Sequence, residues 1–243
     1  LYAPAIFLDS LLQKSVLDVF FLCGALTALA CLLTGDHERR RWWAVLGLAA
    51  GALALTRENA LVLIAVLGAW VWFAAPVPRR GRTHALMTFA AAVGLVLAPV
   101  AARNFAVSGE LYLTTSQFGS NLYIGNNAGA DGSYQPLRFG RGSPEFERAD
   151  AIELAERATG RPLTPAEVSS YWTGRAVAFV RDQPAAWLAL MVRKAALLVN
   201  ASEAIDTESQ ESYAEWSWPL SLLGWLTHFG VLVPLAVVGA WAT

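Results

Sequence analysis

One long apolar run constrains this chain more than any other feature. Residues 15–34 read SVLDVFFLCGALTALACLLT, 20 residues in all. As an α-helix the run would be about 30 Å long, which matches the hydrocarbon core of a bilayer. The composition agrees, because 56% of the chain is hydrophobic and 15% charged, against roughly a quarter charged in ordinary soluble domains. The sequence therefore predicts an all-α protein that crosses a membrane several times.

The next apolar stretch, residues 42–75, is too long for a single crossing. Its 34 residues are divided by the polar turn at 56–59 (TREN) into arms at 42–55 and 60–75. Each arm alone is short for a span, so we expect two short helices joined by a tight turn. A further span is expected at about 84–102, and residues 1–102 are thus predicted to belong to a membrane bundle.

Basic residues set the expected orientation. Lys and Arg in short loops mark the cytoplasmic side, so residues 39–41 and 79–82, which are rich in Arg, are both expected there. An even number of crossings must then separate them, and the two arms provide it. The same count places the 56–59 turn and residues 103–183 on the extracytoplasmic side.

Residues 103–183 are predicted to form a small, mostly helical lobe. Ser143 is a possible N-cap with Pro144 at the first helical position, and Gly160 would end that helix. Thr164 and Glu167 have the spacing of a capping box at the start of a second helix.

Residues 184–243 carry two further elements. The stretch 184–200 is apolar but has Arg193 and Lys194 near its middle, so we expect an interfacial helix, or a span whose charges face a cavity. A last span is expected from about Leu220 onward. Because the chain starts without Met and ends within an apolar run, we interpret it as an internal piece of a longer membrane protein.

Charge and cysteine content argue against some classes of protein. The formal net charge is −1, so no large basic field indicates a nucleic-acid partner. The two cysteines, Cys23 and Cys31, lie in one apolar run, which favours packing over a zinc site or a disulfide framework. The partner that the composition does indicate is the lipid bilayer.

Polar residues gather on the predicted outer side, and the 56–59 turn is the sharpest case. Arg57, between two apolar arms, is either an interface charge or a clamp for a phosphate, since a guanidinium can hold a phosphate with two hydrogen bonds. Glu58 and Asn59 are either helix-end caps or hydrogen-bond partners for sugar hydroxyls. Arg103, where the 84–102 span ends, is another candidate cation.

A second polar stretch, residues 120–134, reads SNLYIGNNAGADGSY. Its Asn and Gly pairs are ordinary turn chemistry, and the preceding residues 110–115 (ELYLTT) indicate a strand. The alternative is a loop that faces carbohydrate, in which Tyr123 and Tyr134 stack on sugar rings. The amides that would bind the hydroxyls are those of Asn121, Asn126 and Asn127.

Lys194 and Asp131 are the remaining candidates for ligand contacts. Lys194 is either a lysine that extends to the interface or a second contact to phosphate. Asp131 is one carboxylate among amides, which indicates a divalent cation only weakly. No metal ligands or cofactor are therefore predicted. Asn200 begins a glycosylation sequon, a pattern that is frequent by chance.

Several of these stretches together resemble a known family. They are LALTREN at 53–59, ARNFAVSGELYLTTSQFGSNLYIGNNAGADGSY at 102–134, LDSLLQKSVLDVF at 8–20 and PAAWLALMVRKAALLVNASE at 184–203. The chain resembles the membrane glycosyltransferases of the C-type (GT-C) superfamily, nearest to the bacterial protein O-mannosyltransferase and aminoarabinose-transferase-like branch. Glu58 stands where Pro is commoner in that branch.

The resemblance implies a helix bundle in the bacterial inner membrane with an extracytoplasmic active site. It implies transfer of a sugar from a polyprenyl phosphate to an extracytoplasmic acceptor, with inversion at the anomeric carbon. Arg57, Arg103 and Lys194 would then stabilise the leaving phosphate, and Glu203 follows Lys194 in the matching stretch. The family's catalytic carboxylate lies in the first outer loop, upstream of this chain, whereas Asp9 sits in a later loop, so no catalytic residue is assigned.

Two other functions stay open at this point. A transporter or flippase for a lipid-linked sugar would also place polar residues among spans, but at the bilayer midplane. A non-catalytic membrane assembly subunit would need none of the cations for chemistry.

Overall fold

The chain divides into two compact units. The computed structural model describes residues 6–8, 11, 13–35, 40–198 and 209–242. The bundle unit comprises Leu12–Thr115, and the lobe unit comprises Leu1–Leu11 together with Ser116–Thr243. No β-strand occurs in these described ranges, which confirms the predicted all-α fold for them.

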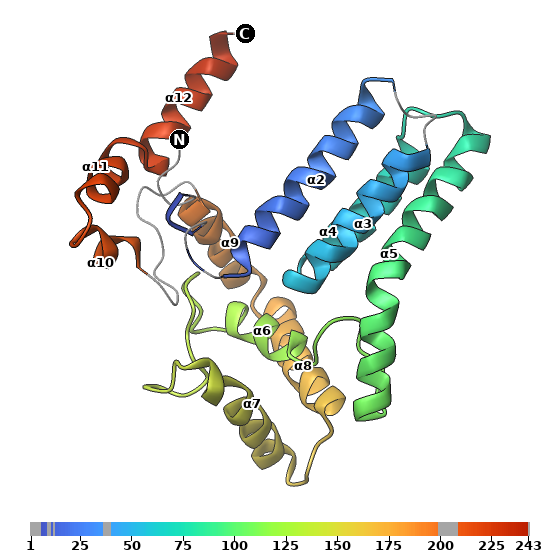
Figure 1. The fold of residues 1–243 in the computed structure, drawn as a ribbon. Helices are drawn as coiled ribbons and strands as arrows, with labels where there is room; N and C mark the ends of the chain where they lie inside the picture. Colours follow the sequence, from blue (N-terminus) through green and yellow to red (C-terminus); the bar gives the residue numbers. More distant parts are fainter. Residues whose placement is uncertain (1–5, 9–10, 12, 36–39, 199–208, 243) are drawn as a thin grey trace. The chain divides into compact units, whose positions relative to one another are not determined.

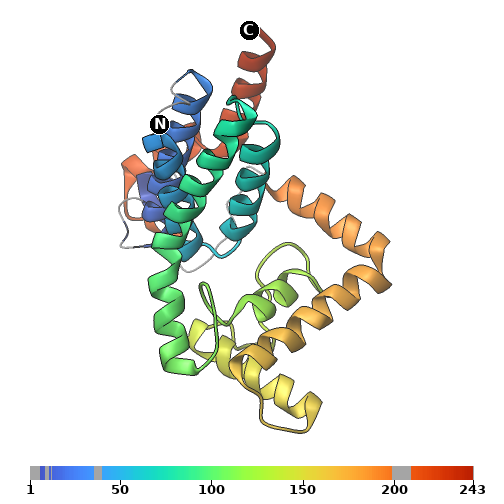
Figure 2. The same ribbon diagram turned by 90° about the vertical axis from the view of Figure 1, so that its right-hand side faces the viewer.

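The described residues of the bundle unit form four helices, namely α2 (Ser15–Leu33), α3 (Arg40–Thr56), α4 (Ala60–Phe73) and α5 (Arg79–Ser108). They lie side by side in Figure 1, and Figure 2 shows the same bundle from a second direction. α3 packs against all three of the others, and Trp43, Leu46 and Leu53 of α3 lie in the core. Gly47 allows α3 and α5 to approach closely, because a Cβ there would lie 2.4 Å from the carbonyl oxygen of Phe89.

Three helical stretches in the described ranges are long and apolar enough to cross a membrane: Ser15–Leu33, Arg79–Ser108 and Trp218–Ala242. Only 17% of the most apolar window of the first is buried, and none of that of the last. Exposed apolar surface of this extent suggests a membrane protein. α3 and α4, the predicted short arms, have 17 and 14 residues, so their crossing of a membrane stays a prediction.

The helix predicted at 84–102 is longer than expected at both ends. α5 runs on through Arg103 and Asn104 to Ser108, and it contains Pro99 in its interior. No residue between 103 and 108 breaks a helix, and Gly109, with a φ of 72°, is the first to leave the helical region. Arg103 is therefore a helical residue, one turn before the end of α5.

The lobe unit is built around α8 (Pro165–Asp182), on which α6 (Phe118–Gly125) and α7 (Pro144–Thr159) both pack. Its core contains Ala151, Ala155, Val168 and Trp172. In the part of this unit that the structure describes, four helices follow, namely α9 (Pro184–Leu198), α10 (Gln210–Ala214), α11 (Trp218–Leu226) and α12 (Phe229–Ala242).

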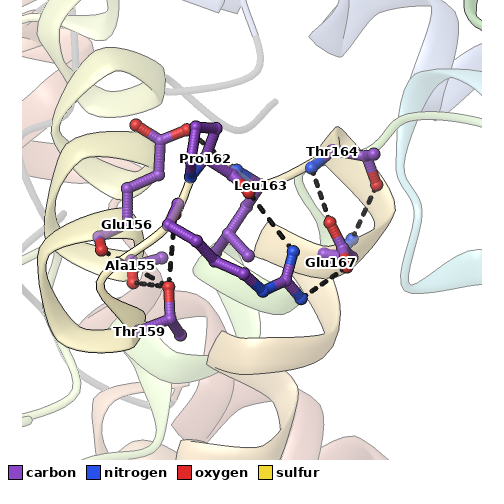
Figure 3. Close-up of polar contacts among 8 residues, drawn as sticks. Ala155, Glu156, Thr159, Pro162, Leu163, Thr164 and Glu167 are labelled. Carbon is purple, nitrogen blue, oxygen red and sulfur yellow. Dashed lines mark hydrogen bonds and ion pairs between the residues drawn. The ribbon is translucent and has the colours of Figure 1, made fainter.

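Both helix starts predicted for the lobe are confirmed. α7 begins at Pro144 and ends before Gly160, although the side chain of Ser143 makes no capping hydrogen bond. The capping box of α8 is complete (Figure 3): Glu167 N donates to Thr164 Oγ1 at 3.4 Å, and Thr164 N donates to Glu167 Oε2 at 2.9 Å. Local sequence signals thus determine where these two helices begin.

Two local expectations for residues 110–125 are wrong. Residues 110–115 are not a strand, because side chains instead of a second strand bind their backbone: Asn104 Nδ2 donates to Tyr112 O at 3.2 Å and to Thr114 O at 3.0 Å. Residues 120–125, expected as part of a loop, belong to α6. α6 is held to α8 at Gly119, whose backbone N donates to Ser169 Oγ at 3.0 Å.

Candidate functional site

Each unit contains one cluster of the residues singled out in the sequence. In the bundle unit, Arg57 follows the end of α3, and its Nε donates to Asp18 Oδ2 in the first turn of α2 at 2.6 Å. The Arg57 side chain is 50% exposed and that of Asp18 is 15% exposed. The ion pair therefore joins the 56–59 turn to α2 and leaves one side of the guanidinium open to solvent.

Glu58 joins the same turn to the segment that follows α5. Its Oε1 accepts hydrogen bonds from Thr114 Oγ1 at 2.9 Å and from Thr115 N at 3.2 Å. Asn104 binds the carbonyl of Thr114 from α5, as described above. We call Asp18, Arg57, Glu58, Asn104 and Thr114 the polar end of the bundle unit. Glu58 thus has a structural partner that the sequence did not reveal.

The other two candidates of the bundle unit contribute less to this cluster. Asn59 is at the N-cap position of α4, but its side chain makes no capping hydrogen bond. Arg103 is exposed on α5, and its Nη1 lies 3.4 Å from Asn104 Oδ1. The structure therefore places Arg57 and Glu58 in the polar end. Arg103 is not a member of this cluster, but it directly precedes Asn104, which is.

In the lobe unit, the polar stretch at 120–134 meets α9 at Lys194. Lys194 Nζ donates to Gly125 O, at the end of α6, at 2.6 Å, and Trp187 Nε1 donates to Asn126 Oδ1 at 3.1 Å. Lys194 is half-buried, and burial lowers the pKa of its ammonium group. We call Gly125, Asn126, Gly132, Trp187 and Lys194 the lysine site.

The amide groups of the two neighbouring asparagines cap the end of α6. Asn126 Nδ2 donates to Leu122 O at 2.9 Å, and Asn127 Nδ2 donates to Tyr123 O at 2.9 Å and to Ile124 O at 3.2 Å. These bonds satisfy carbonyl groups that have no partner within the helix. Contact of these amides with sugar hydroxyls stays a prediction, and a sugar would compete for donors that are already engaged.

Tyr123 packs inside the lobe instead of extending from a loop. Its ring lies 4.7 Å from that of Trp172, and the guanidinium of Arg175 lies 5.7 Å from its centroid. Asn121 is exposed, and Tyr134 donates to Glu147 Oε2 at 3.1 Å. Of the predicted sugar-facing groups in this unit, Asn126 lies at the lysine site. It follows Gly125, which accepts a hydrogen bond from Lys194, and it accepts one from Trp187.

The carboxylate of Asp131 accepts hydrogen bonds from residues of its own turn. Its Oδ1 accepts hydrogen bonds from Ser133 N at 2.9 Å and from Ser133 Oγ at 2.6 Å, and its Oδ2 accepts one from Gln135 Nε2 at 3.1 Å. The hydrogen bond from the Ser133 hydroxyl is the main cause of the lowered pKa of Asp131. Within the described ranges, no group of three His, Cys, Asp or Glu side chains could hold a metal ion.

Some predicted residues lie outside the part that the structure describes, namely Asp9, Asn200 and Glu203. The sequence reasoning in turn missed Asp18, Thr114 and Trp187. Asp18 and Trp187 stand within apolar helices, where a carboxylate or an indole N–H needs a partner. That need is a signal the sequence does carry, but the identity of the partner depends on the fold.

No family model, curated protein or solved structure matches this chain.

Proposed function

We propose that the chain is part of a membrane glycosyltransferase of the C-type superfamily in the bacterial inner membrane. It would transfer a sugar from a polyprenyl phosphate to an extracytoplasmic acceptor, which is a protein, a lipid or a glycan. The observation that carries the proposal is the lysine site. Two of the stretches that resemble this family, 102–134 and 184–203, come together there around an ammonium group, at the bond from Lys194 to Gly125.

The chemistry requires cations and a base. The bond between the anomeric carbon and a phosphate oxygen breaks while the acceptor oxygen bonds to that carbon. Negative charge develops on the leaving phosphate, and fixed cations lower the barrier by stabilising it. Each unit offers candidate cations for this role by itself: Lys194 in the lobe unit, and Arg57 and Arg103 in the bundle unit. The acceptor hydroxyl gives its proton to a base, which we do not assign to any described residue.

Arg57 is suited to hold an anion while it remains in the polar end. It binds Asp18 through Nε, and its two terminal nitrogens have no partner among the described residues. These nitrogens can donate to phosphate oxygens without breaking the ion pair that orients the guanidinium. Asp18 thereby fixes the direction of the donors, and the half-exposed side chain gives the ligand access.

Binding of a phosphate-linked lipid tests the proposal. In the full-length protein reconstituted into vesicles, we expect Lys194→Ala and Arg57→Ala each to weaken polyprenyl phosphate binding by about tenfold or more, the effect of losing one charged hydrogen bond. Binding of the uncharged polyprenol should not change. Arg181→Ala is the matched control, since Arg181 is exposed and pairs with its neighbour Asp182 at 2.8 Å.

Two results would count against the proposal. One is wild-type affinity for polyprenyl phosphate in both the Lys194 and the Arg57 variant. The other is an equal loss of affinity for polyprenol, because a cation that acts on phosphate cannot recognise the neutral lipid. Sugar transfer from a polyprenyl phosphate donor to an acceptor, measured on the same preparations, then tests the catalytic step itself.

A further inference from the structure

α9 presents one face to the 125–132 segment. Trp187 and Lys194 are seven residues apart, two turns of helix, and Leu190 between them is buried. Trp187 binds Asn126 and Lys194 binds Gly125, so this face of α9 is attached to the segment at two points. The Lys194 side chain therefore extends across the segment instead of away from it.

Two glycines of the segment lie beside this side chain. A Cβ on Gly132 would lie 2.7 Å from Leu197 Cδ1 and 3.5 Å from Lys194 Cγ, and Gly132 has a φ of +99° that other residues rarely adopt. A Cβ on Gly125 would lie 3.4 Å from Lys194 Nζ, in contact with the ammonium group itself. A side chain at position 132 would thus meet Leu197 and strain the backbone next to the lysine stem, and a side chain at position 125 would take up the space beside the ammonium group.

We propose that Gly125 and Gly132 form a glycine cradle that positions Lys194 and keeps one side of its ammonium group open to the phosphate of a ligand. The two glycines are positioning residues, since they act through Lys194. Their assignment to a lipid-linked phosphate rests on the function proposed above, whereas the cradle itself rests on the packing of α9 against the 125–132 segment.

Substitution of the two glycines should shift the pKa of the Lys194 ammonium group in opposite directions. A methyl group on Gly125 displaces water beside Nζ, so Gly125→Ala should lower the pKa of Lys194 further. Gly132→Ala is strained at a φ of +99° and puts a methyl group against Leu197, so the segment should shift beside α9, expose the lysine and raise its pKa towards the ordinary value. The other charged groups of these two elements, Asp131 and Arg193, are unchanged in both variants.

The chain allows this to be measured on one side chain, because it has only two lysines, Lys14 and Lys194. Trace acetylation of the full chain over a range of pH, followed by peptide mapping, gives the titration midpoint of each. The control is Gly140→Ala, because Gly140 also has a positive φ (78°) but no atom lies within 4 Å of its Cβ position. Relative to wild type, we expect the titration midpoint of Lys194 to fall in Gly125→Ala, to rise in Gly132→Ala and to remain unchanged in Gly140→Ala. A midpoint that stays in both cradle variants, or shifts equally in the control, would overturn the cradle.

A second arm identifies the phosphate. Vesicles that contain polyprenyl phosphate should protect Lys194 of the wild type from acetylation, with about tenfold weaker protection in both cradle variants. Inorganic phosphate should protect much less. If the midpoints shift as expected but the vesicles give no protection to the wild type, the cradle stands and the glycosyltransferase proposal fails. Equal protection by inorganic phosphate would count against a lipid-linked ligand.

Discussion

At the scale of single residues, the carboxylate of Glu167 connects the loop before α8 to the helix itself. Its Oε2 accepts from Thr164 N, and its Oε1 accepts from Arg161 Nη2 at 2.6 Å. These contacts, that of Arg161 foremost, lower the pKa of Glu167 from 4.5 to about 2. Because the pKa is lower in the folded state, the carboxylate stabilises the fold above about pH 4.5, and this contribution is lost as the pH falls towards 2.

The variant Glu167→Gln tests this pH dependence. Glutamine can still accept from Thr164 N but loses the ion pair with Arg161. We therefore expect a lower thermal unfolding midpoint than wild type at pH 7, and midpoints that converge as the pH falls towards 2. Helical circular dichroism of the detergent-solubilised chain follows the transition. A difference that is the same at pH 7 and near pH 2 would show that the charge of Glu167 has no part in it.

Thr164 gives a second prediction at this scale. Its Oγ1 accepts from Glu167 N and satisfies one of the free N–H groups at the start of α8. Thr164→Ala should lower the free energy of unfolding by about 1 kcal/mol. Thr164→Ser keeps the oxygen and is the control. Chemical denaturation measures both, and equal losses in the serine and alanine variants would exclude the cap as the cause.

At the scale of elements, the contact between α6 and α8 depends on the absence of a side chain. A Cβ on Gly119 would lie 1.8 Å from the carbonyl oxygen of Ser169, so Gly119→Ala must push α6 away from α8. We expect a loss of about 1–3 kcal/mol in unfolding free energy. Gly174 in α8 faces open space, and Gly174→Ala should be neutral or stabilise the helix by up to about 1 kcal/mol. If both variants behave alike, close approach at Gly119 does not hold α6 in place.

The helices α6, α7 and α8 show which features of the lobe can be predicted from the sequence and which cannot. Pro144, Gly160, Thr164 and Glu167 lie within one turn of the helix ends they mark, so α7 and the start of α8 can be predicted from the local sequence pattern. α6 cannot be predicted in this way, because its stability depends on Gly119 against α8 and on asparagine caps whose sequence pattern is that of a turn. The lysine site depends equally on residues more than 60 positions apart in sequence: the pattern suggests Lys194 as a cation, whereas its partner on α6 comes from the fold.

At the scale of the whole molecule, the chain's own cysteines can be used to test whether the apolar surface of α2 faces lipid. Cys23 lies on α2 and is exposed, whereas Cys31 is partly buried. If α2 crosses a membrane, lipid covers Cys23 and keeps a water-soluble reagent from its thiol. In native vesicles we therefore expect a membrane-impermeant maleimide to leave Cys23 unmodified until the protein is unfolded in detergent.

An added cysteine gives the matched control and tests the orientation as well. Gly142, in the lobe, is exposed with open space around its Cβ position. Gly142→Cys should react with the same maleimide in intact cells whose outer membrane has been permeabilised, because residues 103–183 are predicted to be extracytoplasmic. Reaction only after lysis would reverse the predicted orientation. Reaction of Cys23 as fast as that of Gly142→Cys, before any detergent is added, would mean that α2 faces water, and the membrane glycosyltransferase proposal would lose its physical basis.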